Sequence, residues 1–111
     1  MTDTANGKAA LSLFEDDRVV AIASRELKSA GQSQRPLSDF LKEIEDIRET
    51  GIAWDLDEHT QGISAAGFAF QDPVGLVYAI SVPVPSHRFA GLRESLATQL
   101  LGAREAVAKL V

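Results

Sequence analysis

The chain has 111 residues, of which 45% are hydrophobic, a formal net charge of −5 and no cysteine. This length supports one hydrophobic core, so we expect a single domain over residues 1–111. The lack of cysteine excludes a disulfide framework and thiolate metal sites, and the scattered Lys and Arg residues argue against direct binding of DNA or RNA.

Membrane insertion is also not expected, because no apolar run is long enough to span a bilayer. A cytoplasmic location fits the absence of cysteine, since disulfides are rare in a reducing compartment.

Two helices are expected near the start of the chain. The first covers residues 7–14, with Thr4 or Asn6 as its N-cap. Its apolar stripe consists of Ala10, Leu13 and Phe14. The second runs from residue 15 to 27 and opens with three acidic residues, which suit the positive end of a helix dipole.

The third helix has the clearest start and stop signals. Residues 28–36 are rich in Ser, Gly and Gln and predict a loop. Ser38 is the expected N-cap of a helix over residues 39–50, and Gly51 stands where helices usually end. The apolar stripe of this helix consists of Phe40, Leu41, Ile44 and Ile47.

A β-rich region follows. It starts with a short strand at Ile52 and an acidic turn over residues 55–62. Two longer strands, 63–70 and 76–84, flank the turn 71–75, which contains Asp, Pro and Gly, so they predict an antiparallel hairpin.

The two faces of this hairpin carry side chains of different size, because side chains alternate along a strand. The small-residue face consists of Ile63, Ala65, Gly67, Ala69, Val77, Ala79, Ser81 and Pro83. The bulky face consists of Ser64, Ala66, Phe68, Phe70, Leu76, Tyr78, Ile80, Val82 and Val84. The small-residue face has two interpretations: a helix packed unusually close, or a ligand cavity with Ser81 as its polar anchor.

The last helix is expected over residues 89–110, after a turn at 85–88. Its apolar stripe consists of Leu92, Leu96, Leu100, Ala103, Val107 and Leu110. We expect this stripe to cover the bulky face. Because a sheet of three strands has open edges, we also expect the chain to belong to a larger sheet or to pair with a second copy.

Two chemical alternatives carry less weight. His59 and the carboxylates beside it offer metal ligands, but one histidine on an acidic turn is more typical of a solvated loop, so no metal is expected. Ser81, His59 and Asp55 are the residue types of a hydrolase, but no nucleophile-elbow pattern surrounds Ser81. We therefore predict no catalytic residue and no enzyme activity.

Several separated segments resemble the effector-binding domain of the IclR family of bacterial transcription regulators. In chain order these segments are TANGKA (4–9), IRETGIA (47–53), DEH (57–59) followed by Gly62, AA (65–66), AISV (79–82) before Pro85, and RF (88–89). The resemblance covers nearly the whole chain. It implies an α+β fold with a GAF-like or profilin-like curved antiparallel sheet, helices packed on one face and a small-molecule pocket on the other.

The match is to the later, larger part of that domain. The resemblance therefore implies a sheet that is incomplete at its N-terminal side, without the family's winged helix-turn-helix and first strands. The implied function is a ligand-sensing domain whose effector modulates DNA binding by the helix-turn-helix domain. The implied partners are a small organic or aromatic acid and further copies in a homodimer or tetramer, with no cofactor. The alternative is a structural or oligomerisation module without a ligand.

Carried over from the family residue by residue, the ligand-binding positions are Ala5, Asn6, Asp55, Ile63, Ala65 and Ser81. A helix N-terminus at the first two positions suits an anionic ligand. Ser81 can donate a hydrogen bond, and Asp55 can accept one or orient a donor. Pro83 stands where the family has a serine, which removes one donor.

Overall fold

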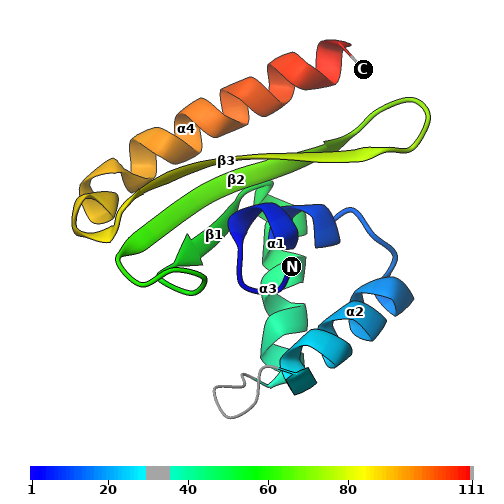
Figure 1. Ribbon diagram of the computed structural model, residues 1–111. Helices are drawn as coiled ribbons and strands as arrows, with labels where there is room; N and C mark the ends of the chain where they lie inside the picture. Colours follow the sequence, from blue (N-terminus) through cyan, green and yellow to red (C-terminus); the bar gives the residue numbers. More distant parts are fainter. Residues whose placement is uncertain (30–35, 111) are drawn as a thin grey trace.

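The computed structural model describes residues 1–29 and 36–110 (Figure 1). Its elements, in chain order, are α1 (Ala5–Leu11), α2 (Asp16–Ser29), α3 (Leu37–Thr50), β1 (Ala53–Leu56), β2 (Ile63–Gln71), β3 (Val77–Pro85) and α4 (Ser86–Leu110). The predicted α+β class and the predicted order of helices and strands are confirmed. Within the described part of the chain, no helix is long and apolar enough to cross a bilayer.

The three strands form one antiparallel sheet in the order β1-β2-β3. The hairpin register places Ala65 opposite Pro83 and Gly67 opposite Ser81. Strand β1 is short and pairs with β2 only as far as Gly67. This register keeps the small side chains of the hairpin together on one face, as the alternation predicts.

The bulky face of the sheet packs against α4, as predicted. Ala66 and Phe68 of β2 form a buried cluster with Leu100 of α4. Figure 1 shows α4 running along the hairpin on the side opposite to the other three helices. The predicted stripe is only partly buried, because Leu92 and Leu110 at its two ends are exposed.

The small-residue face is covered by α1, and this corrects the expectation that helices lie on one face only. Ala9 of α1 lies in one buried cluster with Ala53 and Ala69 of the sheet, and Ala79 packs against that cluster. The helix contacts all three strands. Alanine and glycine side chains allow this close approach, so the interpretation as a closely packed helix holds for this part of the face.

Helix α3 packs against α1, α2 packs against α3, and residues of all three helices share one buried cluster (Figure 1). Arg48 of α3 holds the connection between α1 and α2, because its guanidinium donates to the carbonyls of Ser12 (3.0 Å) and Phe14 (2.9 Å). It also donates to the carboxylate of Asp16 at 2.7 Å, and this hydrogen bond raises the pKa of Arg48. The predicted loop 28–36 lies largely outside the described residues, and α2 continues to Ser29.

Three predicted helix boundaries are wrong, each for a local reason. Helix α1 starts and ends earlier, with Thr4 as N-cap, so Leu13 and Phe14 lie beyond it and the predicted stripe does not form. Helix α3 starts at Leu37 without a side-chain cap, because the Pro36 carbonyl accepts from the first amides and places Ser38 inside the helix. The turn expected at 85–88 is replaced by a direct passage from β3 into α4.

Gly51 provides a test of how α3 ends. It adopts the left-handed conformation, with φ 84°, and its amide donates to the carbonyl of Ile47. We expect Gly51→Ala to lower the free energy of unfolding by about 1–2 kcal/mol, because a β-carbon is strained there. Gly102→Ala on the exposed surface of α4, where a β-carbon meets nothing within 4 Å, is expected to raise it by about 0.5–1 kcal/mol. Urea unfolding measures the free energy of unfolding of both variants. The same change in both would contradict a requirement for glycine at the end of α3.

Candidate functional site

Four of the six predicted ligand-binding residues lie in the sheet and share the face that α1 covers. Asp55 of β1 is directly opposite Ala65 of β2, which is opposite Pro83 of β3. Ile63 lies two residues before Ala65, and Ser81 two residues before Pro83, so their side chains point to the same face. The structure therefore brings these four positions together beside α1.

The other two predicted residues, Ala5 and Asn6, form the first turn of α1. Ala5 is buried, whereas Asn6 is exposed. Thr4 caps this end of the helix, and its side-chain oxygen accepts from the amide of Gly7 at 2.9 Å. The first turn of α1 therefore presents one buried apolar group and one solvent-facing amide side chain.

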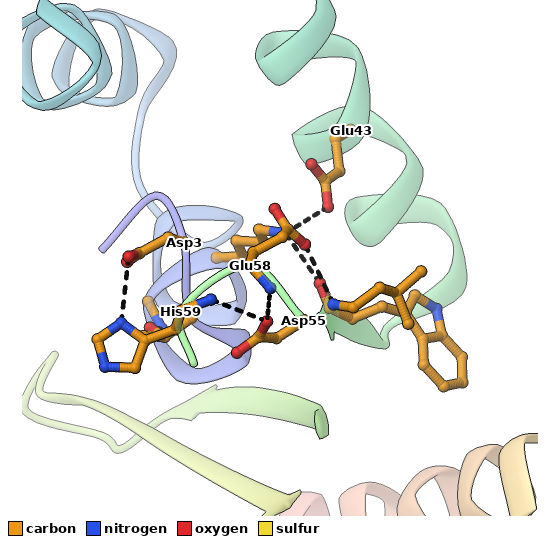
Figure 2. Close-up of polar contacts among 10 residues, drawn as sticks. Asp3, Glu43, Asp55, Glu58 and His59 are labelled. Atoms are coloured by element: carbon orange, nitrogen blue, oxygen red, sulfur yellow. Dashed lines mark hydrogen bonds and ion pairs between the residues drawn. The ribbon is translucent and has the colours of Figure 1, made fainter. Parts of the chain in front are cut away.

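Asp55 is buried, and one oxygen of its carboxylate is used by the turn that follows β1 (Figure 2). This oxygen, Oδ1, accepts from the amides of Glu58 at 2.9 Å and His59 at 3.3 Å. Such a side-chain acceptor fixes the conformation of a turn in the way that a backbone carbonyl does. Asp55 therefore shapes the turn next to the candidate site.

Ser81 differs from Asp55 in that its side chain is not used by a hydrogen bond of the described residues. It is half-buried, and its hydroxyl has no hydrogen-bond partner among residues 1–29 and 36–110. Gly67 lies directly opposite, where a β-carbon would come within 2.9 Å of the Ser81 β-carbon. Any larger residue at position 67 would thus press on Ser81, so glycine keeps the space around the hydroxyl.

Two apolar cavities lie away from these residues. One of about 400 Å³ lies between α4 and the end of β2, beside Leu13. The other, of about 230 Å³, lies between α2 and α3. Neither is lined by any of the six predicted residues, so neither is the small-molecule pocket that the family resemblance implies.

The structure does not assemble the hydrolase-like set. The ring of His59 lies 3.1 Å from the carboxylate of Asp3, ahead of α1 (Figure 2). Asp55 binds backbone amides, and Ser81 contacts neither side chain by a hydrogen bond. No group of three potential metal ligands occurs in the described ranges 1–29 and 36–110.

Lys8 is the residue that the sequence reasoning missed. Its side chain is 0% exposed, and its ammonium donates to Glu43 of α3 (2.9 Å), the carbonyl of Trp54 in β1 (2.9 Å) and Glu58 in the turn (2.5 Å). Figure 2 shows the carboxylates of Glu43 and Glu58 close together, and both accept from the Lys8 ammonium. One buried charge therefore joins α1 to α3, β1 and the turn beside the candidate site.

A signal for this lysine exists in the sequence. Residues three and four apart share a helix face, so Ala5, Lys8 and Ala9 lie on the same buried face of α1. A lysine in the centre of an apolar face indicates a buried ion pair, because buried charges need partners. Its partners lie 35 and 50 residues away, so periodicity alone does not identify them.

Comparison with known proteins identifies one family. The family model described as bacterial transcriptional regulator IclR C-terminal matches residues 1–109. The HTH-type transcriptional regulator Rv1719 of Mycobacterium tuberculosis is 36% identical over 98 residues, which cover 87% of this chain and 38% of that protein. The chain thus spans well under half of this relative's length.

Solved structures agree with the family model. The C-terminal domain of the Escherichia coli transcriptional regulator KdgR is 26% identical, with a TM-score of 0.73 over 92% of this chain and 65% of that chain. The inducer-binding domain of PobR from Acinetobacter, solved as a double mutant with 3-hydroxybenzoic acid, is 18% identical, with a TM-score of 0.77 over 99% of this chain and 68% of that chain. At this identity the second likeness concerns the fold alone. The proteins similar to this chain are transcriptional regulators.

The buried ammonium of Lys8 leads to a stability prediction. Lys8→Met leaves the Trp54 carbonyl without its donor and removes the cation between Glu43 and Glu58. We expect the free energy of unfolding to fall by about 2–4 kcal/mol, because breaking a buried ion pair leaves its partners uncompensated. Lys42→Met, on the exposed side of α3, is the matched control and should change it by less than about 0.5 kcal/mol. Urea unfolding measures both variants. An equal loss of unfolding free energy in the two would show that the three contacts of Lys8 do not stabilise the fold.

Proposed function

This chain belongs to the IclR family of bacterial transcriptional regulators, in which it matches the C-terminal domain, and we propose that it binds a small organic effector. The single observation that carries the proposal is the half-buried Ser81 hydroxyl, which has no hydrogen-bond partner in the described part of the chain. Within the described residues no buried side-chain oxygen or nitrogen lacks a partner, so this hydroxyl still reaches solvent, and a ligand can take the place of solvent there.

The surroundings of Ser81 favour a small ligand. Ala65 and Gly67 leave room on the sheet, and the exposed side chain of Asn6 offers a second donor at the first turn of α1. We propose that the ligand contacts Ala5, Asn6, Ile63, Ala65 and Ser81. Asp55 would fix the turn that follows β1. An organic or aromatic acid is the proposed ligand class, because the side chains of Ser81 and Asn6 can both donate hydrogen bonds. A double mutant of the PobR inducer-binding domain, which shares this fold, forms a complex with 3-hydroxybenzoic acid.

In the whole regulator, the effector is proposed to act on DNA binding through a helix-turn-helix domain outside this chain. An effector changes an equilibrium only by binding one arrangement of the protein more tightly than another. The ligand would therefore favour one arrangement of the subunits and of their paired DNA-binding domains. We place this regulator in the cytoplasm and propose that this chain is one part of its effector-binding domain.

A second candidate function, from a different class, is oligomerisation through β3. This strand is at the edge of the sheet, and Tyr78 and Ile80 on it are 45% and 44% exposed. Unpaired backbone groups and exposed apolar side chains on an edge strand favour pairing with another strand. The two functions are compatible, because oligomerisation would use the free edge and the bulky side of β3, whereas Ser81 points to the side of α1.

The ligand proposal is tested by thermal-shift screening of small aliphatic and aromatic carboxylic acids, starting with 3-hydroxybenzoate. For an acid that stabilises the chain, Ser81→Ala should raise the dissociation constant about 5–10-fold, the loss of one hydrogen bond of about 1–1.5 kcal/mol. Ser38→Ala on the exposed face of α3 is the control and should leave it unchanged. Stabilisation by none of the acids, or binding that is insensitive to Ser81→Ala, would contradict the proposal.

The oligomerisation candidate predicts that Ile80→Lys shifts the chain toward the monomer, because a charge replaces an apolar contact at the edge strand. Sedimentation velocity measures this shift. Val74 lies in the turn between β2 and β3 and is 81% exposed. Val74→Lys is therefore the control and should leave the sedimentation coefficient unchanged. A wild-type chain that is monomeric at all concentrations would exclude this function for the isolated chain.

A further inference from the structure

Three consecutive residues of the turn between β1 and β2 each reach a different part of the molecule. Glu58 contacts Lys8 of α1, His59 contacts Asp3 ahead of α1, and Asp57 contacts Ser86 at the start of α4. Helices α1 and α4 lie on opposite faces of the sheet (Figure 1). The turn is therefore a polar connection between two helices that the sheet separates.

The contact with α1 is made through the buried ammonium of Lys8. The Glu58 carboxylate lies 2.5 Å from it and also accepts from the amide of Leu56 at 3.3 Å. The Lys8 side chain is 0% exposed and that of Glu58 is 31% exposed, so this partly buried contact is less screened by water than a surface ion pair. A displacement of α1 therefore pulls directly on the backbone of the turn.

The contact with α4 is made by Asp57. One oxygen of its carboxylate accepts from the amide of Gly62 at 2.8 Å and from the hydroxyl of Ser86 at 2.5 Å. The Ser86 hydroxyl is also 2.9 Å from that of buried Ser64, and the Ser86 amide donates to the carbonyl of Gly62 at 2.8 Å. A carboxylate beside the first residue of a helix also interacts favourably with the helix dipole.

The backbone conformation of the turn makes the two contacts interdependent. Asp57 has a φ of 61°, a left-handed conformation that is unfavourable for a residue with a β-carbon and persists where surrounding contacts hold it. Asp57 and Glu58 are joined by one rigid peptide plane. If the Glu58 contact is released, the conformation that directs Asp57 toward Ser86 loses one of its supports.

We propose that the turn 57–59 couples α1 to the first turn of α4, with Glu58 and Asp57 as positioning residues. Movement of α1 on one face of the sheet is thereby transmitted to the start of a 25-residue helix on the other face. The proposal rests on the proposed function for the event that moves α1, which is the arrival of an effector beside its first turn. Much of the outer surface of α4 is exposed, so a change at its start reaches the surface of the molecule.

Amide hydrogen exchange of the ligand-free chain, followed by NMR, tests this coupling. The reporters are the amides of residues 90–93, which donate to the carbonyls of the first turn of α4. Glu58→Ala should accelerate their exchange at least about fivefold while leaving residues 104–110 unchanged. Glu43→Ala is the matched control, because it also leaves Lys8 with one carboxylate but lies on α3, and it should not change exchange in α4.

A double-mutant cycle completes the test. Ser86→Ala removes the hydroxyl that ties α4 to Asp57, so Glu58→Ala should have no further effect on residues 90–93 in that background. Three results would overturn the proposal: unchanged exchange in Glu58→Ala, an equal effect in Glu43→Ala, or a uniform acceleration over the whole chain. Because no ligand is present, such a failure leaves the outcome of the carboxylic acid screen intact.

Discussion

The arrangement of this molecule depends on one buried positive charge. Helix α1 has only seven residues, too few for a helix to be stable in isolation, so its position has to come from tertiary contacts. The Lys8 ammonium makes three of these contacts, because a buried charge needs acceptors and finds them in α3, in β1 and in the turn after β1. The elements that surround the candidate ligand site are therefore held together by the same charge that would otherwise destabilise the core.

Side-chain periodicity predicts the elements well where one face of each is consistently apolar. The stripe through Phe40, Ile44 and Ile47 identifies α3, and alternation along the hairpin separates the two faces of the sheet. Periodicity fails for α1, where the expected stripe includes residues beyond the end of the helix. There the buried face contains a lysine, and the end of the helix depends on contacts from Arg48, which is remote in sequence.

The candidate site is predictable from sequence only in part. The alternation places Ala65 and Ser81 on one face, and the family resemblance adds the first turn of α1 and Asp55. That α1 covers much of this face does not follow from sequence, because small residues are equally suited to a close helix and to a ligand. The contacts of residues 57–59 are also beyond local reasoning, since their partners come from two segments, residues 3–8 and Ser86, that are far from the turn in the chain.

The covering of an alanine- and glycine-rich face has a mechanical consequence. Bulky side chains interdigitate and lock two elements in one register, whereas a shallow surface such as that formed by Ala53, Ala69 and Ala79 offers few ridges to hold a helix. The burial of Ala9 and Leu11 holds α1 in the core, and the polar contacts of Lys8 and of the Ser12 carbonyl add to this in fixing its position. On the sheet side, α1 is therefore held by close contact of small side chains, and its polar contacts add the direction that such a face does not provide.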